Sequence, residues 1–321
     1  MPRILFVKTS SLGDVVHNCP AVSDVARNVP GAVIDWVVEE AYAEVVALHP
    51  RVGRVIPVAI RRWRGALLAA ATWSEFGAFR AALRSERYDA VIDSQGLLKS
   101  ALVASLAQGR KHGFDRASAR EPFTSHFYDV EHAVPATLHA VDRNRQLAAS
   151  ALGYRVEDPC DYGLRVSDGN PMQVRKPFAL LFTMTSRDDK LWPEEHWRSL
   201  GNALEDRGLH CLLPWGTEEE RRRCARIATS IPGAVVPGRM TLTQLASLAR
   251  EARFVVGVDT GLAHLAAALD VPVIGLYCGS DPGLTGLHPG GLEGGKWTRS
   301  LGNAGSPPTV AEVLKIVEPL L

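Results

Sequence analysis

The sequence lacks the features of secreted, membrane-spanning and disulfide-stabilised proteins. Only five of its 321 residues are cysteines, and no two of them form a Cys-x-x-Cys pair. Neither a disulfide framework nor a zinc ribbon is therefore predicted, and reduced thiols fit a cytoplasmic protein. No apolar run approaches the ~20 residues of a membrane span. The apolar start Ile4–Val7 is too short for the core of a signal peptide. We expect a cytoplasmic protein that meets a membrane only as a peripheral protein.

Several catalytic signatures are also missing. The chain contains no His-Glu-x-x-His, no Gly-x-Ser-x-Gly and no Gly-x-x-x-x-Gly-Lys-Ser/Thr, which argues against a zinc protease, a serine hydrolase and a P-loop kinase. The turn after the first predicted strand lacks the Gly-x-Gly-x-x-Gly spacing of a dinucleotide site. The 36 Lys and Arg residues balance 35 Asp and Glu residues, so no overall positive field attracts nucleic acid. A local cluster must hold any anionic ligand.

What the sequence does contain is a repeated alternation of short apolar runs with longer amphipathic ones, which is typical of parallel sheets covered by helices on both faces. The first half predicts strands at Ile4–Val7, Val33–Val38, Val55–Val58 and Ala90–Ile92, and helices at Asp14–Asn28, Tyr42–Leu48, Phe76–Glu86, Leu97–Leu106 and His139–Leu152. A stretch rich in Gly and Pro, Cys160–Pro177, predicts a linker. The second half predicts strands at Phe178–Phe182, His210–Leu213, Phe254–Val258 and Val273–Tyr277, and helices at Glu194–Asp206, Glu218–Ser230, Thr241–Arg250, Gly261–Leu269 and Pro307–Leu320.

This pattern predicts an α/β protein of two Rossmann-like, doubly wound domains, over residues 1–162 and 163–321, with a ligand cleft between them. The terminal helix remains open to packing back on the N-terminal domain. The Gly-rich loop over residues 283–302 has no assigned role.

Asp14 is the first candidate for chemistry, in the stretch Lys8–His17 that follows the first strand. A carboxylate in the first turn of a helix complements the helix dipole, so a purely structural role is open. The alternative is a general base at the carboxyl end of the strand.

Two further loops predict an anion site. Thr185, Ser186 and Lys190 follow the strand Phe178–Phe182, and hydroxyls with a cation suit a phosphate. Asp259-Thr260-Gly261 ends an apolar strand, where a glycine lets an anion approach the free N–H groups of the next helix. His264, one turn along, either reaches the same ligand or packs internally. A capping role without a ligand is the structural alternative for both loops.

The densest basic cluster is Arg61-Arg62-Trp63-Arg64, which follows the strand Val55–Val58. Guanidinium groups beside an indole can hold phosphates or carboxylates in bidentate fashion, although a solvated basic run is the usual explanation of such a cluster. Arg120 is a further candidate for this patch.

Taken together, these motifs resemble the ADP-heptose:lipopolysaccharide heptosyltransferases, glycosyltransferase family 9, which have the GT-B fold. The matching stretches are Val7–Asp14, Asp35–Glu40, Val55–Arg64, Tyr88–Ser100, Ala119–Pro122, Arg187–Trp197, Leu213–Gly216 and Val258–His264. The Arg-Arg-Trp-Arg stretch favours the type I members, which act on Kdo, over type II, which act on the first heptose. Gly65 departs from the family's pattern, which has a lysine there.

The resemblance implies a role for each candidate residue. Asp14 matches the catalytic base, and Lys190 the cation that stabilises the leaving ADP. The implied ligands of ADP-heptose are Thr185, Ser186, Lys190, Glu220, Met240, Asp259, Thr260, Gly261 and His264. The implied ligands of Kdo2-lipid A are Arg61, Arg62, Arg64 and Arg120. No Asp-x-Asp pair occurs, so no metal and no other cofactor is expected for an inverting transfer at the cytoplasmic face of the inner membrane. A nucleotide-sugar epimerase or hydrolase, or a non-catalytic nucleotide-sugar-binding protein, remains the alternative.

Overall fold

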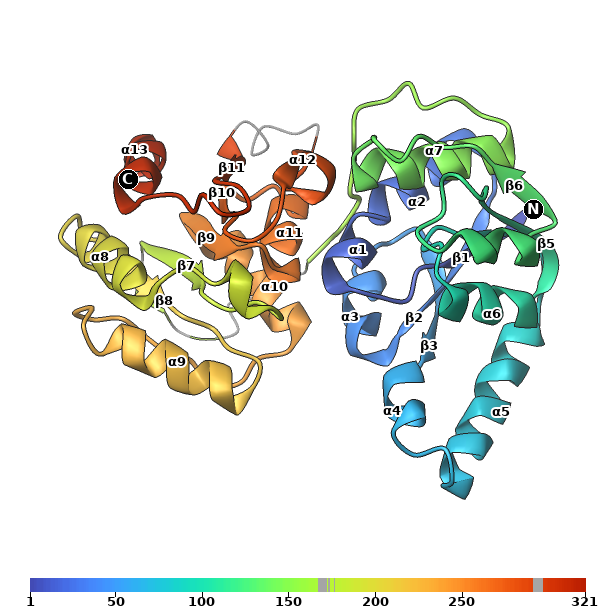
Figure 1. Cartoon of the computed structure of the whole chain (residues 1–321), viewed down its shortest axis with the longest axis horizontal. Helices are drawn as coiled ribbons and strands as arrows, with labels where there is room; N and C mark the ends of the chain where they lie inside the picture. The colour runs from blue at the N-terminus through green and yellow to red at the C-terminus, as the bar shows by residue number, and fades with distance from the viewer. Residues whose placement is uncertain (167–171, 173, 176, 291–296) are drawn as a thin grey trace. The chain divides into compact units, whose positions relative to one another are not determined.

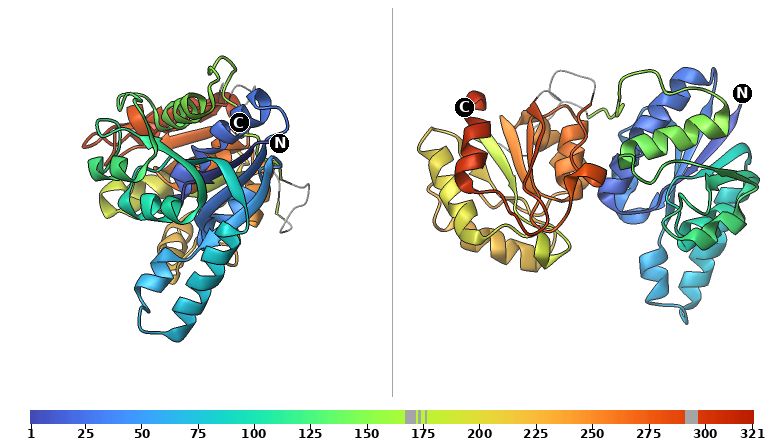
Figure 2. Two further views of the ribbon diagram at one scale, coloured as in Figure 1. Left: turned by 90° about the vertical axis from the view of Figure 1, so that its right-hand side faces the viewer. Right: turned by 45° about the horizontal axis from the view of Figure 1, so that its top comes forward.

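The computed structural model describes residues 1–166, 172, 174, 175, 177–290 and 297–321. The chain divides into two compact units, Met1–Arg165 and Val166–Leu321, each built on one parallel sheet with helices on both faces (Figures 1 and 2). The predicted boundary lay three residues earlier. Cys160, Tyr162 and Leu164 bury alternate side chains, and the N–H of Arg165 donates to the carbonyl of Leu48 at 2.8 Å. The first residues of the predicted linker therefore belong to the packed structure, and part of the rest lies outside the described residues.

The first unit has a six-stranded sheet. Its strands are β1 (Arg3–Val7), β2 (Val33–Glu39), β3 (Val52–Val58), β4 (Arg87–Asp93), β5 (Gln108–Phe114) and β6 (Val130–His132), in the order β3-β2-β1-β4-β5-β6. Leu5 and Val7 of β1 share a core with α5 (Ala70–Arg84) and α6 (Leu98–Leu106). Helices α2 (Cys19–Asn28) and α7 (Ala140–Leu152) lie side by side on the opposite face (Figure 1). The strand order reverses between β1 and β4, which is where such sheets bind ligands.

The second unit has a five-stranded sheet. Its strands are β7 (Phe178–Phe182), β8 (His210–Leu212), β9 (Phe254–Val258), β10 (Val273–Leu276) and β11 (Arg299–Leu301), in the order β11-β10-β9-β7-β8. Helices α8 (Glu194–Glu205), α9 (Glu218–Ala228) and α13 (Val310–Val317) share the core of one face. Helices α10 (Leu242–Glu251) and α11 (Gly261–Ala268) pack together, and α11 contacts β9 and β10. The order reverses between β7 and β9. The terminal helix α13 packs on α8 and β10 within this unit.

The structure departs from the predicted elements at several places. The predicted helix Asp14–Asn28 is two helices, α1 (Leu12–Val16) and α2, because Pro20 occupies the first turn of α2, where a proline is tolerated. Helix α5 begins at Ala70, six residues before the predicted start. Strands β5, β6 and β11 and the short helix α4 (Ile60–Arg64) were not predicted. Part of the Gly-rich loop, residues 291–296, lies outside the described residues.

Candidate active site

Asp14 stands in the first turn of α1, just beyond the carboxyl end of β1 at the reversal point of the first sheet. Its Oδ2 accepts hydrogen bonds from the backbone N–H of Ser11 at 3.0 Å and from the Ser11 hydroxyl at 3.1 Å. Its Oδ1 accepts from a terminal nitrogen of Arg120 at 3.0 Å. Asp14 therefore both caps α1 and lies at the edge of the sheet where ligands bind.

Two cations control the charge of Asp14. Burial raises the pKa of this carboxyl, but the nearby charges of Lys8 and Arg120 lower it more, and the result lies well below the ordinary range. Lys8 directly follows β1 with its side chain buried, and its Nζ donates to the carbonyl of Ser94 at 2.8 Å. Burial lowers the pKa of Lys8 to about 8, against the opposing effect of Asp14. Asp14 is therefore ionised at neutral pH.

The loop Thr9–Ser10 beside Asp14 is fixed by side chains that follow β4. The amide oxygen of Gln95 accepts from the N–H of Thr9 at 2.7 Å and from its hydroxyl at 2.8 Å. Lys99 Nζ donates to the Ser10 hydroxyl at 2.6 Å. The sequence assigned no role to Lys8 or Gln95. The signal that could have pointed to Lys8 is its position directly after the apolar strand β1.

The four predicted acceptor arginines are not equivalent in the structure. Arg62 forms a two-pronged ion pair with Glu40, at 3.0 Å for each nitrogen–oxygen pair, and a second ion pair with Glu75 at 2.8 Å. Arg61 lies over the ring of Tyr42, and its charge, after burial, lowers the pKa of Lys99. Arg64 makes no ion pair among the described residues. Arg120 thus contacts Asp14 and Arg61 acts on Lys99, whereas Arg62 is paired with both Glu40 and Glu75.

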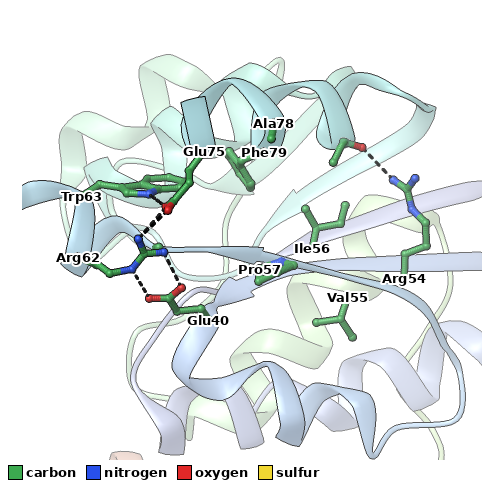
Figure 3. A pocket seen from close by; sticks show the side chains of 12 residues that line it. Glu40, Arg54, Val55, Ile56, Pro57, Arg62, Trp63, Glu75, Ala78 and Phe79 are labelled. Carbon is green, nitrogen blue, oxygen red and sulfur yellow. Dashed lines mark hydrogen bonds and ion pairs between the residues drawn. The ribbon is translucent and has the colours of Figure 1, made fainter. Parts of the chain in front are cut away.

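A groove of about 620 Å³ lies along the edge strand β3, beside α4 and α5 (Figure 3). Val55, Ile56 and Pro57 form its floor, and Arg62 closes one end. The indole N–H of Trp63 donates to Glu75 at 2.8 Å, which holds α4 against α5. The second residue of the Arg-Arg-Trp-Arg motif and its tryptophan therefore build the α4–α5 junction.

The second unit carries its own charged centre, at the reversal point of its sheet. Asp259 follows β9, and its Oδ2 accepts from Lys190 Nζ and from the Ser280 hydroxyl, each at 2.6 Å. His264 Nε2 lies 3.6 Å from Oδ1. Burial raises the pKa of Asp259, but hydrogen bonds from His264, Lys190 and Ser280 lower it well below its ordinary range. Ser280 had no place in the sequence prediction, because it lies in a loop without a recognisable motif.

The two predicted phosphate loops meet at Asp259. The Thr185 hydroxyl donates to the carbonyl of Asp259 at 2.8 Å, which ties the loop after β7 to the loop after β9. Thr260 is the N-cap of α11 and Gly261 its first residue. The first N–H groups of a helix have no acceptor within the helix, so this end favours an anion. Ser186 is exposed beside Arg187, which pairs with Asp189. These residues together can hold a pyrophosphate.

Glu220 and Met240 stand apart from this network. The Oε2 of Glu220 accepts from the N–H groups of Gly216 at 2.6 Å and Thr217 at 3.1 Å, so the residue caps α9. Met240 is half-buried, directly before the N-cap of α10. Neither forms a hydrogen bond or ion pair with Asp259 or Lys190 among the described residues. Within the same ranges, no three His, Cys, Asp or Glu side chains are grouped so as to hold a metal ion.

Comparison with known proteins agrees with this arrangement. The model of glycosyltransferase family 9 (heptosyltransferase) matches residues 76–303. Lipopolysaccharide heptosyltransferase 1 of Escherichia coli K12 is 48% identical over 288 residues, which cover 88% of this chain and 90% of that relative. The solved structure of E. coli heptosyltransferase WaaC with ADP superposes with a TM-score of 0.89 at 43% identity, covering 99% of this chain and all of the other. WaaC with ADP-2-deoxy-2-fluoro heptose gives a TM-score of 0.84 at 42% identity, over 99% of this chain and all of the other.

Proposed function

Because the chain belongs to glycosyltransferase family 9, the heptosyltransferases, we propose that it transfers L-glycero-D-manno-heptose from ADP-heptose to a Kdo residue of Kdo2-lipid A. The observation that carries this proposal is the 48% identity, over 88% of the chain, to lipopolysaccharide heptosyltransferase 1. The reaction belongs to the assembly of the lipopolysaccharide core. For the type II alternative, transfer to the first heptose, the solved E. coli heptosyltransferase II is 21% identical to this chain.

In the proposed mechanism, Asp14 removes the proton from a Kdo hydroxyl as that oxygen attacks the anomeric carbon of the heptose. The bond from the anomeric carbon to the ADP oxygen breaks, and the configuration inverts. Three features support Asp14 as the base: its pKa is lowered so that it is ionised, it lies at the carboxyl end of β1, and Arg120 holds it in place. Lys99 is affected by the charges of both Asp14 and Arg61, and the two cations, Lys99 and Arg61, suit the acceptor's carboxylates.

The second unit is proposed to hold the donor. Thr260 and Gly261 at the start of α11 face the pyrophosphate, and Lys190 offsets the charge that develops on the departing ADP. Asp259 keeps Lys190 in position through their 2.6 Å contact and is proposed to bind heptose hydroxyls. Glu220 and Met240 are proposed to contact the ribose and adenine.

One assay tests the proposal. The protein is incubated with ADP-heptose, with and without Kdo2-lipid A, and ADP release is measured. We expect release only with the acceptor, together with a heptosylated lipid in the mass spectrum. Equal release without acceptor would indicate a hydrolase, and conversion of ADP-heptose without release would indicate an epimerase. Heptosylation only of an acceptor that already carries one heptose would indicate type II.

The proposed place of action is the cytoplasmic surface of the inner membrane, since Kdo2-lipid A is a membrane lipid. None of the described helices is long and apolar enough to cross a bilayer.

A further inference from the structure

The loop between α4 and α5 exposes large apolar side chains. Nine consecutive residues, Gly65–Trp73, carry no charged group. Leu67 is 56% exposed, Leu68 103% and Trp73 61%. Helices α4 and α5 project from the rest of the first unit, and this loop forms their far end (Figures 1 and 2). We call Gly65–Trp73 the apolar tip.

The apolar tip is held in a defined shape by its own side chains. The Thr72 hydroxyl donates to the carbonyl of Ala66 at 2.8 Å, and the Trp73 indole N–H donates to the carbonyl of Leu67 at 2.9 Å. The Ala66 carbonyl also accepts from the N–H of Ala69 at 3.0 Å, and the Trp73 bond satisfies a Leu67 carbonyl that would otherwise need water. Satisfied carbonyls reduce the cost of moving the tip into a less polar medium. A turn with internal hydrogen bonds therefore holds Leu67 and Leu68 exposed to solvent.

A row of aromatic rings connects the tip to the core. Trp73 meets Phe76 edge to face at 6.2 Å between ring centres, and Phe76 meets Trp63 in the same way at 5.9 Å. Trp63 lies 5.9 Å from Phe79, which is buried in the core shared with the sheet. These ring contacts attach the tip to the core of the folded unit.

The charges beside the tip are positive. Arg61 and Arg64 precede it, and no acidic residue occurs between Arg64 and Glu75. The two nearest carboxylates, Glu40 and Glu75, are both paired with Arg62. Exposed leucines and a tryptophan next to unneutralised arginines are the composition of a segment that lies in the interface of an anionic membrane.

We propose that the apolar tip docks into the headgroup region of an anionic phospholipid bilayer, with Leu67, Leu68 and Trp73 inserted and Arg64 on the lipid phosphates. The inference rests on the proposed function, because the acceptor is itself a lipid of that bilayer. The geometry disfavours a second copy of the chain as the occupant. Stable protein interfaces bury about 1,600 Å² in total, whereas the tip offers three large side chains on a narrow projection.

Binding to acceptor-free vesicles tests the inference independently of activity. Phosphatidylethanolamine–phosphatidylglycerol vesicles are titrated into the wild type, the double variant Leu67→Ser/Leu68→Ser, and the control Leu284→Ser, which changes a leucine 46% exposed on α12 (Pro282–Thr285). We expect the double variant to need at least about tenfold more lipid for half-maximal binding, and the control to match the wild type. Equal binding of all three proteins, or no binding of the wild type, overturns the proposal.

A second measurement covers the case in which the double variant does not fold. All five cysteines are buried, so Leu68→Cys provides a single accessible thiol for an environment-sensitive dye. We expect a blue-shifted emission with the same vesicles, and an unshifted emission overturns the proposal. An unshifted spectrum with vesicles, together with a shift that grows with protein concentration, would instead identify self-association.

Activity assays separate this inference from the proposed function. The double variant should retain wild-type turnover on deacylated, water-soluble Kdo2-lipid A and lose turnover on the acceptor in vesicles. If the wild type transfers heptose to neither acceptor, the proposed function fails while the vesicle titration still decides on the tip. Equal loss on both acceptors would place Leu67 and Leu68 in the acceptor site and overturn membrane docking.

Discussion

Asp14 accepts hydrogen bonds through both carboxylate oxygens, from Ser11 and from Arg120. A carboxylate held in this way is a weak base, so its contribution depends on position more than on intrinsic basicity. An acceptor carboxylate that draws Arg120 away would remove one of the charges that lower the pKa of Asp14. The base would then be strengthened only when the acceptor is bound.

Replacement of Asp14 tests its role. We expect Asp14→Asn to lose roughly 10²–10⁴-fold in kcat, the usual contribution of a general base, while ADP-heptose binding measured by calorimetry stays unchanged. Glu131→Gln, which alters an exposed carboxylate on β6, should retain full turnover. Turnover of Asp14→Asn within about tenfold of the wild type would exclude Asp14 as the base.

Lys8 should set the pH at which Asp14 titrates. In the wild type the pKa of Asp14 is well below its ordinary value of 3.8, so the acidic fall in activity lies below the working range. Lys8→Met removes a lowering charge and keeps the burial that raises the pKa. The acidic fall in kcat/KM should therefore move to higher pH. Above about pH 8, where Lys8 itself loses its proton, the two profiles should converge. Superimposable acidic limbs would show that Lys8 is only structural.

Lys190 and Glu220 should affect different steps. Lys190→Ala should lower kcat, because the stabilised charge develops in the transition state. Glu220→Ala should mainly weaken ADP affinity, because a ribose contact is similar in ground and transition states. Glu220 also caps α9, so Thr217→Ala, which removes the capping hydroxyl alone, is the matched control. Equal ADP affinity in the wild type and Glu220→Ala, or an equal loss in Thr217→Ala, would remove the ribose role.

At the scale of elements, the short helix α4 divides its arginines between two tasks. Arg62, with its ion pairs to Glu40 and Glu75, joins α4 to its neighbours. Arg61 projects toward the ring of Tyr42 and acts electrostatically on Lys99. The linear Arg-Arg-Trp-Arg motif therefore contains one acceptor candidate that acts on Lys99, one structural arginine and one arginine next to the apolar tip.

Acceptor kinetics distinguish these tasks. Arg61→Ala should raise the KM for water-soluble, deacylated acceptor about tenfold or more, since a charged hydrogen bond contributes roughly 1.5–3 kcal/mol, and added salt should shrink the effect. Donor binding should not change. Arg61→Ala/Arg62→Ala should raise the KM further, because α4 also loses its attachment. Arg80→Ala, an exposed arginine of α5, is the control. An unchanged KM in the double variant would move the acceptor site toward Arg120 and Lys99.

The elements that the sequence predicted are those with apolar periodicity, such as β1 and β9, whose side chains are buried throughout or nearly so. Strand β5 was missed because Gln108, Arg110 and Lys111 interrupt its apolar pattern, and hydrogen bonding to β4 and β6 outweighs that pattern. Helix α4 was not predicted because its five residues are mostly arginine and tryptophan, without an apolar periodicity. Local pattern detects a buried face, whereas strands with polar sequences and short helices depend on their neighbours.

In the candidate site, too, some residues could be predicted from local sequence and others could not. Asp14, Lys190 and Asp259 could be found because each follows or ends a motif at the carboxyl end of a strand. Ion pairing between Lys190 and Asp259 could not be predicted, because the two lie 69 residues apart and meet only where β7 and β9 adjoin. The contact of Ser280 with Asp259 and that of Lys8 with Ser94 could not be predicted for the same reason. Pairings of this kind need the strand order, which no single segment contains.

At the scale of the whole molecule, a net charge of +1 means that no overall field guides the anionic substrates. Positive charge is instead concentrated where each sheet reverses its strand order. In the first unit Lys8, Lys99 and Arg120 surround Asp14, and in the second Lys190 stands beside the start of α11. We therefore propose one local anion site in each unit, which would suit an acceptor with carboxylates and a donor with a pyrophosphate.

Because the second unit has its own positive charge beside the proposed pyrophosphate site, we predict that the reaction proceeds without a metal ion. In the proposed mechanism, Lys190 and the free N–H groups at the start of α11 offset the charge of the departing pyrophosphate, and both are in place before the reaction begins. Asp259, the carboxylate nearest to that site, is already bound by Lys190 and Ser280. We expect heptose transfer to continue at the wild-type rate in excess EDTA, and Lys190→Ala to remain impaired when Mg²⁺ or Mn²⁺ is added. Loss of activity in EDTA that either metal restores would show that a metal, and not Lys190, stabilises the leaving group.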